Sequence, residues 1–460
     1  MHSYSYPLYD VPQCSSFKEF MVSIKERFSD QVAFKDYNHI WTYSLLYDYV
    51  RCLLTYFIND NQRFYYLTAE HPVYFFIAFF AITISGNTAI LCEPYQCYEG
   101  AEYRIIDEEK IIDMLSVSSC MDFPEETYSE MCCAIAKSSG TTSVAKGVML
   151  SQKNLLSDMV GGMQCYEYPL GAVYYHVLPH HHLFGLVADL LGPLYSGGTI
   201  CFSDNKLNFF KDIKHFQPSH MNLPPAMIYA IEKMLVMSDN TPKVLGGRLK
   251  KIMCAGARLN ENSRNVLKKY GIEVLSAYGL TECSPCISMN RDLSSKPDSV
   301  GQILPCCDVS IVDGEITVRG DNVMMGYWNE PEATNNTIHN GWLYTGDLGY
   351  LDEDGFLFLI GRKSNLIVFE DGTKVIPEVL ENEIISMAGV VECLLSRQII
   401  NQRTMLKLII VKDNLKSEED ITKIVQRCFK AYNLSDKVAE VLFSQQDLPK
   451  NSLGKIIRNR

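Results

Sequence analysis

Hydrophobic and polar residues follow two periods along the chain, and each period predicts a different kind of element. Short apolar runs predict strands, and longer mixed segments with apolar residues three or four apart predict helices. Examples are expected strands at 199–202, 251–254 and 273–275 and expected helices at 222–237 and 260–270. Strands that alternate with helices in this way are typical of parallel sheets covered by helices, so we expect an α/β fold.

Two regions depart from this alternation. The most apolar run, 73–84, is too short to span a bilayer and predicts a buried helix before a strand at 88–92. From residue 300 to 360, short β runs separated by Asp-Gly turns predict hairpins. A small α+β module is expected after them, with helices at 377–387 and 420–432 and strands at 390–399, 405–411 and 441–443. We place a domain boundary near Ser364.

Length and composition narrow the class of protein. A chain of 460 residues is long enough for two or three domains, and 47% hydrophobic with 21% charged residues is ordinary for a soluble globular protein. A net charge of −12 disfavours nucleic acid or an anionic membrane as the partner of the whole chain. The N-terminus lacks a basic start and an apolar core, so we expect no secretory leader. The apolar run 73–84 is too short for a transmembrane segment, and we expect none. A cytoplasmic location is therefore expected, with reduced thiols for the sixteen cysteines.

The richest chemical signal is the segment 137–148, Lys-Ser-Ser-Gly-Thr-Thr-Ser-Val-Ala-Lys-Gly-Val. Gly140 lets backbone N–H groups turn inward beside several hydroxyl side chains, and Lys146 adds a positive charge. This donor set suits a polyphosphate; the alternative is a solvated Ser/Thr loop. The segment is not a standard P-loop, because glycine does not directly precede a Lys-Ser/Thr pair.

Four further segments carry candidate chemistry. His180, His181 and His182 are consecutive; on an expected strand neighbours point to opposite faces, so pocket lining is favoured over a shared metal. Thr281 and Glu282 end the segment 277–282, and a carboxylate beside a polyphosphate implies Mg²⁺ if the two loops meet; the alternative is an ordinary turn.

The last two candidates lie nearer the C-terminus. Asp347, in Tyr-Thr-Gly-Asp-Leu-Gly, can accept both hydroxyls of a ribose, and Arg362 follows fifteen residues later. Lys455 lies in a basic, glycine-containing tail. Each has a simpler alternative, a β-turn aspartate in one case and a solvated terminal lysine in the other.

In this order, the five segments resemble the adenylate-forming superfamily of acyl-CoA synthetases, adenylation domains and firefly-type luciferases. The resemblance covers nearly the whole chain, and segment 361–381 is most similar to fatty acyl-CoA synthetases. It implies a large N-terminal domain (1–361) of parallel sheets with helices plus a small β-barrel-like part. A small mobile α+β C-terminal domain (362–460) is expected to follow, rotating about a hinge near Ser364.

The resemblance also implies a role for each motif in a two-step reaction, in which a carboxylate and ATP give an acyl adenylate and a thiol then displaces AMP. Lys455 is expected to contact the carboxylate and the α-phosphate, and His182 to line the acyl site. Thr281 and Glu282 are expected to hold phosphate and Mg²⁺. The expected nucleotide contacts are Ser138, Ser139, Gly140, Thr141, Thr142 and Lys146 for the β- and γ-phosphates, Asp347 and Arg362 for the ribose, and Gly256, Ala257, Tyr278 and Gly279 for the adenine. Gly372 is expected to line a pantetheine tunnel after rotation.

The chain departs from the family pattern in three places. Ser143 and Ala145 stand where the family usually has glycine and proline, so we expect altered stiffness of the loop with retained ATP binding. Ser364 replaces the common aspartate or lysine at the hinge. The stretch between Pro94 and Lys137 is short, which puts contacts to the nucleotide end of CoA in doubt.

The sequence leaves more than one candidate for the acid substrate and for the thiol acceptor. The region after His182 lacks the aspartate that amino-acid-selecting relatives use, and Asp189 lies a full turn or more away, so an acid without an α-amino group is favoured. Mostly apolar expected pocket walls suit a fatty or aryl acid. The leading hypothesis is an AMP-forming acid–thiol ligase that uses ATP, Mg²⁺ and CoA. The alternatives are an enzyme that loads the phosphopantetheine of an acyl carrier protein and a non-catalytic protein that binds ATP or acyl-AMP.

Overall fold

The computed structural model describes residues 4–60, 62–92, 104–117, 119–138, 146–203, 206–237, 242–256, 259, 261–291, 295–387, 389–413, 416–450 and 456–458. The chain divides into two compact units. The first contains residues 1–309, 318–343 and 353–356, and the second contains residues 310–317, 344–352 and 357–460. A functional division at residue 361, with a mobile C-terminal domain, stays a prediction.

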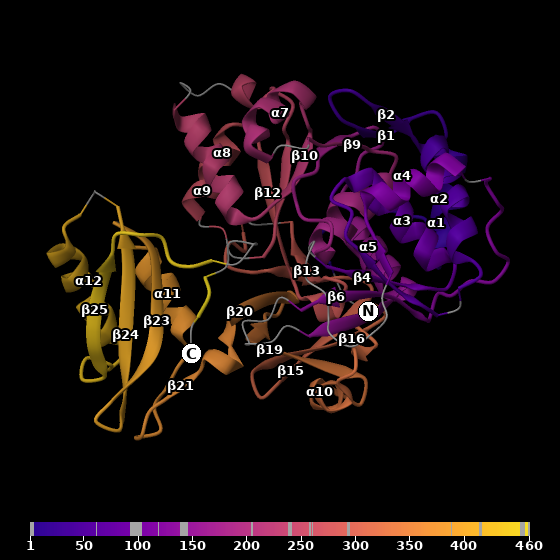
Figure 1. Ribbon diagram of the computed structural model, residues 1–460. Helices are drawn as coiled ribbons and strands as arrows, with labels where there is room; N and C mark the ends of the chain where they lie inside the picture. The colour runs from indigo at the N-terminus through magenta and orange to yellow at the C-terminus, as the bar shows by residue number, and fades with distance from the viewer. Residues whose placement is uncertain are drawn as a thin grey trace. The chain divides into compact units, whose positions relative to one another are not determined.

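The larger sheet of the first unit has a mainly parallel core (Figure 1). Its strand order is β14-β13-β12-β11-β10-β8-β9-β1-β2. The bounds are β1 Val32–Lys35, β2 Ile40–Thr42, β8 Val173–Tyr175, β9 Thr199–Cys201, β10 His220–Leu223, β11 Lys251–Cys254, β12 Glu273–Gly279, β13 Cys286–Asn290 and β14 Gly301–Ile303. All neighbours from β12 to β1 run parallel, which confirms the parallel sheet expected from the alternating pattern.

The smaller sheet of this unit has the order β17-β7-β6-β4-β3-β5. Its strands are β3 Phe64–Leu67, β4 Thr88–Leu91, β5 Arg104–Ile106, β6 Cys132–Lys137, β7 Gly147–Ser151 and β17 Gly326–Tyr327. Strands β5, β3, β4 and β6 are parallel, whereas β6, β7 and β17 are antiparallel. The β6–β7 hairpin therefore carries the expected phosphate loop between its strands.

Helices cover both sheets. In the first unit they are α1 Phe17–Phe28, α2 Tyr43–Phe57, α3 Pro72–Ile84, α4 Glu108–Val117, α5 Gln152–Cys165, α6 Gly192–Tyr195, α7 Phe209–Phe216, α8 Pro225–Met237, α9 Glu261–Lys269 and α10 Pro331–Thr337, with a π-helix at Phe184–Leu191 and short 3₁₀ turns at Lys206–Asn208, Pro242–Leu245 and Thr281–Cys283; β18 (Ile338–His339) is a short edge strand. Helix α3 is the expected buried apolar helix: Phe79 and Phe80 pack against the ring of Phe17 from α1. Among the described residues, no helix has both the length and the apolar character needed to cross a membrane.

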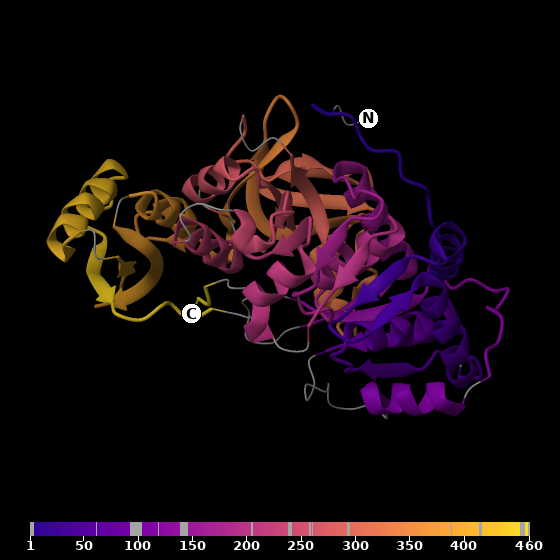
Figure 2. The same ribbon diagram turned by 90° about the horizontal axis from the view of Figure 1, so that it is seen from above.

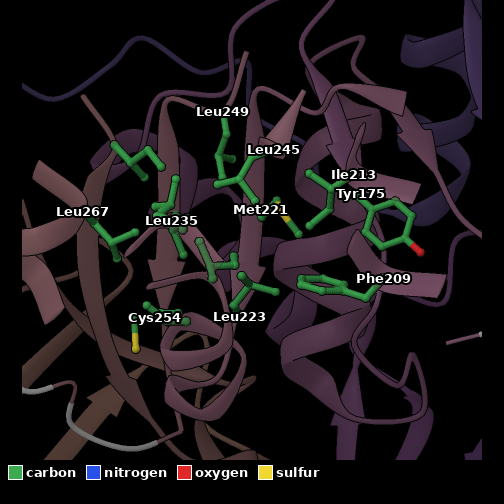
Figure 3. Close-up of a cluster of buried hydrophobic side chains, with 14 of the residues drawn as sticks. Tyr175, Phe209, Ile213, Met221, Leu223, Leu235, Leu245, Leu249, Cys254 and Leu267 are labelled. Atoms are coloured by element: carbon green, nitrogen blue, oxygen red, sulfur yellow. The ribbon is translucent and has the colours of Figure 1, made fainter. Parts of the chain in front are cut away.

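A cluster of buried side chains forms the core under α7, α8 and α9 (Figure 3). Strand residues such as Met221 and Leu223 of β10 face helix residues such as Ile213 of α7 and Leu235 of α8. Burying each such side chain contributes about 1.5–3 kcal/mol. This packing fixes the positions of β10 and β11, and with them the loops that follow each strand.

Three local expectations about secondary structure are wrong. The helix expected from residue 222 begins only at Pro225, because Asn222 belongs to β10 and a proline is favoured at the first helical position. The three consecutive histidines do not lie on a strand: β8 ends at Tyr175, and His180–His182 form a turn that leads into the π-helix. Strand β12 also extends through Gly279, so Tyr278 belongs to the strand instead of following it.

The expectation that all cysteines are reduced is wrong at one pair. Cys52 of α2 and Cys120 form a disulfide that spans 68 residues of sequence. The remaining thirteen described cysteines form no disulfide. Cys283 and Cys286, whose Cys-x-x-Cys spacing could suggest a redox or metal site, are among these. Burial raises the pKa of both thiols well above the usual value, which does not favour a reactive redox pair.

The second unit contains the strand run β15-β16-β19-β20, a two-stranded sheet, a three-stranded sheet and helices. Its C-terminal part is the yellow ribbon of Figure 2. The elements that lie wholly or partly in the second unit are β15 Cys307–Val312, β16 Glu315–Gly320, β19 Trp342–Leu351, β20 Phe356–Arg362, a 3₁₀ turn at Lys363–Asn365, β21 Ile367–Val368, β22 Lys374–Val375, α11 Pro377–Ile385, β23 Val390–Ile400, β24 Arg403–Lys412, α12 Glu418–Ala431 and β25 Val438–Ser444. Helices α11 and α12 bury their apolar residues on one face of β23-β24-β25, and Leu448 of the tail packs against Leu394 and Val411 on the other. The C-terminal segment is therefore held against the sheet.

Candidate functional site

The neck of the expected phosphate loop is closed by two reciprocal contacts. The backbone N–H of Ser138 donates to the carbonyl of Lys146 at 2.9 Å, and the N–H of Lys146 donates to the hydroxyl of Ser138 at 3.0 Å. These bonds continue the β6–β7 ladder by one step beyond Lys137 and Gly147. Ser138 and Lys146, which flank the expected loop in sequence, are therefore fixed to each other at the end of the hairpin.

Thr281 and Glu282 come to this hairpin from the larger sheet. The hydroxyl of Thr281 donates to the carbonyl of Lys137 at 3.5 Å. This contact places the end of the segment 277–282 beside the last residue of β6, although the two positions are 144 residues apart in sequence. The segment 277–282 therefore reaches the strand that leads into the expected phosphate loop.

A small charged cluster surrounds Glu282. The hydroxyl of Tyr327 donates to Glu282 Oε1 at 2.9 Å, and burial followed by the charge of Glu282 raises the pKa of this tyrosine. Lys146 lies 4.7 Å from the centre of the Tyr327 ring and 3.7 Å from Glu330 Oε2. The cluster therefore offers one ammonium group, one hydroxyl donor and two carboxylates at the mouth of the hairpin.

Gly279 is required in this arrangement because the backbone at Pro285 passes too close to leave room for a side chain. A Cβ at this position would collide with the carbonyl group of Pro285. The chain therefore folds back tightly after β12, and the N–H of Cys286 at the start of β13 donates to the buried carboxyl of Asp158 at 3.0 Å. The short turn Thr281–Cys283 is fixed between these two anchors.

Parallel pairing gathers further expected residues at one edge of the larger sheet. In β8, β10, β11 and β12, carboxyl ends of adjacent parallel strands lie side by side, where ligands bind in open α/β sheets. His182 follows β8, Gly256 follows β11 with φ +90°, and Tyr278 lies at the end of β12. Gly256 and Tyr278 therefore lie at this edge, close in sequence to β11 and to Thr281 and Glu282, whereas His182 comes seven residues after the end of β8.

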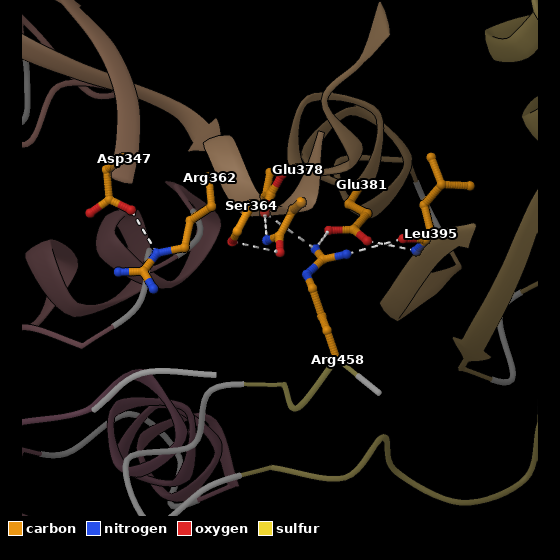
Figure 4. Close-up of polar contacts among 8 residues, drawn as sticks. Asp347, Arg362, Ser364, Glu378, Glu381, Leu395 and Arg458 are labelled. Carbon is orange, nitrogen blue, oxygen red and sulfur yellow. Dashed lines mark hydrogen bonds and ion pairs between the residues drawn. The ribbon is translucent and has the colours of Figure 1, made fainter. Parts of the chain in front are cut away.

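In the second unit, Asp347 and Arg362 face each other across β19 and β20 (Figure 4). Arg362 Nε donates to Asp347 Oδ1 at 2.7 Å, and the side chain of Asp347 is only 11% exposed. Beside them, Glu315 accepts from the N–H of Gly346 and pairs with Lys363 at 2.7 Å. The structure therefore brings the two expected ribose contacts together as a pair.

Gly372 lies at the tip of the β21–β22 hairpin. It has φ +83°, and its N–H donates to the carbonyl of Phe369 at 3.0 Å. A Cβ at Gly372 would meet no atom within 4 Å. The glycine is thus required by the backbone conformation of the turn and not by crowding within its own unit.

Arg458 fixes the tail beyond Lys455 (Figure 4). It donates to the carbonyl of Leu395 at 3.0 Å and forms an ion pair with the buried carboxylate of Glu381 on α11. Burial raises the pKa of Glu381, and the charge of Arg458 opposes this rise. On the other side of residues 451–455, Lys450 pairs with Glu392.

Six expected site residues lie outside the described residues, and their roles stay predictions. They are Ser139, Gly140, Thr141, Thr142, Ala257 and Lys455. The departures at Ser143 and Ala145 lie outside the described residues as well.

Comparison with known proteins gives this geometry a family. Residues 107–328 match the family model of the AMP-binding enzyme. This region is an AMP-binding enzyme domain. The match covers Lys146, Thr281, Glu282 and Tyr327, and it confirms the resemblance to adenylate-forming enzymes.

The relatives of the AMP-binding domain include ligases. A long-chain-fatty-acid–CoA ligase of Escherichia coli O157:H7 is 29% identical over 340 residues, which are 69% of this chain and 59% of that protein. The 4-coumarate–CoA ligase-like 9 protein of Oryza sativa subsp. japonica is 31% identical over 353 residues, 71% of this chain and 63% of that protein. The chain thus aligns with about six tenths of the length of these relatives.

Two solved structures are similar to nearly the whole chain. ATP-bound MatB from Rhodopseudomonas palustris has a TM-score of 0.82 at 21% identity, with 96% of this chain and 97% of that chain covered. O-succinylbenzoate coenzyme A synthetase from Bacillus subtilis, in complex with ATP and magnesium ion, has a TM-score of 0.79 at 20% identity, with 96% and 98% covered. These likenesses confirm the expected α/β fold class.

Sequence reasoning missed three residues of the candidate site. Tyr327 and Glu330 contact Glu282 and Lys146 from the segment around β17, and Arg458 anchors the tail. A tyrosine after glycine gives no sign in sequence that its hydroxyl will reach a carboxylate 45 residues earlier.

Proposed function

We propose that the protein activates a carboxylic acid with ATP and transfers the acyl group to a thiol. In the first step the carboxylate oxygen attacks the α-phosphorus of ATP, which gives acyl-AMP and releases pyrophosphate. In the second step a thiol sulfur attacks the acyl carbon, which gives a thioester, AMP and a proton. The observation that carries the proposal is the contact between Thr281 and the end of β6, because it joins two separate candidate phosphate-binding segments.

The charges of the described residues support the first step. ATP and a carboxylate repel each other, so a site that joins them needs positive charge. Lys146 is described at the mouth of the hairpin, and Lys455 would supply the second ammonium group by resemblance. A carboxylate is already ionised at neutral pH, so the first step needs no general base.

Glu282 and Thr281 fit a magnesium ion. Mg²⁺ prefers hard oxygen ligands and is usually held by one or two carboxylates together with phosphate oxygens. Within the described ranges, no group of three or more His, Cys, Asp or Glu residues is arranged to hold a metal. A site of one carboxylate and one hydroxyl therefore suits an ion that arrives with ATP, where Mg²⁺ would neutralise phosphate charge. The hydroxyl of Tyr327 would orient the carboxylate of Glu282.

Free CoA is the proposed thiol, and a fatty acid is the proposed substrate. Both choices are supported by the name of the Escherichia coli relative, a long-chain-fatty-acid–CoA ligase. The alternative acceptor, the phosphopantetheine of an acyl carrier protein, carries the same reacting thiol. A cytoplasmic location completes the proposal: thirteen of the described cysteines form no disulfide, although Cys52 and Cys120 form one.

The test is a panel of fatty, aryl and short-chain acids with the full-length protein, ATP and Mg²⁺. Pyrophosphate release would report the first step, and mass spectrometry with CoA or a holo carrier protein would identify the thioester. We expect release with a fatty acid and a product on CoA. A product on the carrier protein alone would replace CoA as acceptor, and no release with any acid would overturn the proposal in favour of a non-catalytic binding protein.

A further inference from the structure

A chain of three buried ionisable residues lies beside the turn that carries His182. His176 Nδ1 is 2.6 Å from Asp189 Oδ2, His176 Nε2 is 3.4 Å from His180 Nδ1, and His180 Nε2 is 2.8 Å from the carbonyl oxygen of Ala69. Asp189 is fully buried, and each histidine is 7% exposed. The carboxylate of Asp189 forms no ion pair with a lysine or arginine among the described residues; its pair is with His176.

The ends of this chain determine where protons must lie. A carbonyl oxygen only accepts, so His180 carries its hydrogen on Nε2 toward Ala69. An ionised Asp189 also only accepts, so His176 must then carry a hydrogen on Nδ1. Asn222 Nδ2 donates to the other oxygen of Asp189 at 3.1 Å, and this contact needs no hydrogen from Asp189.

With only these two ring hydrogens, the contact between His176 Nε2 and His180 Nδ1 would be unfavourable. Neutral His176 and neutral His180 would point lone pairs at each other across 3.4 Å, and the buried cluster would keep the full negative charge of Asp189. Burying an uncompensated charge is costly. One additional proton solves both problems, because it makes the middle contact a hydrogen bond and makes the cluster neutral.

We propose that Asp189, His176 and His180 share this additional proton and thereby position the turn that carries His182. The proton lies on either imidazole or on Asp189; each arrangement satisfies all three contacts. Asp189 belongs to the π-helix, His176 directly follows β8, and Ala69 lies in the loop after β3. The hydrogen bonds of this cluster therefore connect three segments of the protein. The positioning role rests on the proposed function, since it assumes that His182 lines the acyl site. The proton count does not.

Asp189→Asn is a discriminating variant. Its amide can accept from Asn222 and donate to His176 Nδ1, so His176 then donates from Nε2 to His180, and His180 from Nε2 to Ala69. Every hydrogen bond is kept with two neutral imidazoles and without the additional proton. Asp189→Leu, in contrast, removes the partner of His176 altogether.

The experiment is imidazole NMR on the full chain labelled with ¹⁵N-histidine, with His176→Gln and His180→Gln used to assign signals. We expect His176 and His180 of Asp189→Asn to carry one hydrogen each, on Nε2. In the wild type we expect a further hydrogen shared between the two rings or between His176 and Asp189. Unprotonated signals for both His176 Nε2 and His180 Nδ1 in the wild type would overturn the proposal.

Kinetics test the positioning role separately. We expect Asp189→Leu to raise KM for the acid about tenfold with less than about a twofold change in KM for ATP, and Asp189→Asn to recover most of the loss. Equal effects of both variants would overturn the positioning role. If the wild type released no pyrophosphate with any acid, the proposed function would fail, and the NMR result would still decide the proton count. If Asp189→Leu failed to fold, the Asp189→Asn spectra would still decide the proton count.

Discussion

Arg362 donates its Nε–H to Asp347 at 2.7 Å, and the two residues are direct partners across β19 and β20. The arginine therefore orients one oxygen of the carboxylate before any ligand binds. This arrangement suits a carboxylate that accepts from ribose hydroxyls, because its position is already fixed.

Asp347→Asn should weaken nucleotide binding. The amide keeps the shape of the side chain but loses the charge that strengthens hydrogen bonds to it, worth about 1.5–3 kcal/mol. We expect KM for ATP to rise between about tenfold and a hundredfold, measured by pyrophosphate release. Asp308→Asn is the matched control, since Asp308 pairs with Arg319 on the surface at 3.5 Å. Equal KM values for the two variants would contradict the ribose role.

Lys455→Ala should separate the two half-reactions. Loss of the ammonium group expected at the α-phosphate should lower pyrophosphate release by at least about a hundredfold, while thioester formation from supplied acyl-AMP continues. Lys450→Ala is the control, because Lys450 lies in the same tail and pairs with Glu392. If Lys455→Ala reduced both half-reactions alike, Lys455 would not have the proposed role in adenylation.

Gly372→Trp should have the opposite effect. We expect thioester formation to fall more than about tenfold while pyrophosphate release stays within about twofold of the wild type, because bulk at a pantetheine tunnel blocks the second step only. Gly372→Ala is the control for the positive φ, which alone costs about 1 kcal/mol. Normal thioester turnover in the tryptophan variant would count against the tunnel.

Arg458→Met should destabilise the C-terminal unit in a pH-dependent way. It leaves Glu381 buried without its cation, a loss of about 3 kcal/mol at neutral pH. Burial already raises the pKa of Glu381, and removal of Arg458 raises it further, so stability is lost as pH rises above the ordinary value of the carboxyl group. Urea unfolding should show a large loss at pH 8 and a smaller one at pH 5. Adding Glu381→Gln should reverse most of it; an equal loss at both pH values would disprove this explanation.

The sequence predicted the elements better than the contacts between them. Helix α3 and the alternating strands follow from apolar residues within each element, so local pattern was sufficient. The start of α8 was predicted three residues too early. Asn222 belongs to β10, and the helix begins at Pro225, after a second proline at 224. The contacts that build the site join distant positions: Tyr327 with Glu282 across 45 residues and Arg458 with Glu381 across 77. One sequence carries no signal for such pairs, because tertiary packing alone brings them together.

Tyr327→Phe should change the magnesium requirement. The Tyr327 hydroxyl donates to Glu282 Oε1 at 2.9 Å, so its loss leaves the carboxylate free to rotate. Groups that orient a metal-binding carboxylate in this way typically change metal affinity tenfold or more. We expect the Mg²⁺ concentration for half-maximal pyrophosphate release to rise about tenfold at fixed ATP, with maximal release recovered at high Mg²⁺.

A matched control separates this effect from general loss of a hydroxyl group. Tyr350→Phe removes a hydroxyl from a side chain that is 49% exposed and stacks on Phe358, so it should leave the Mg²⁺ dependence unchanged. Chelation of Mg²⁺ with EDTA should abolish release in the wild type and in both variants. An unchanged Mg²⁺ requirement in Tyr327→Phe would mean that Glu282 does not depend on this hydrogen bond to hold the ion. Release that persists in EDTA would remove Mg²⁺ from the role assigned to Glu282 altogether.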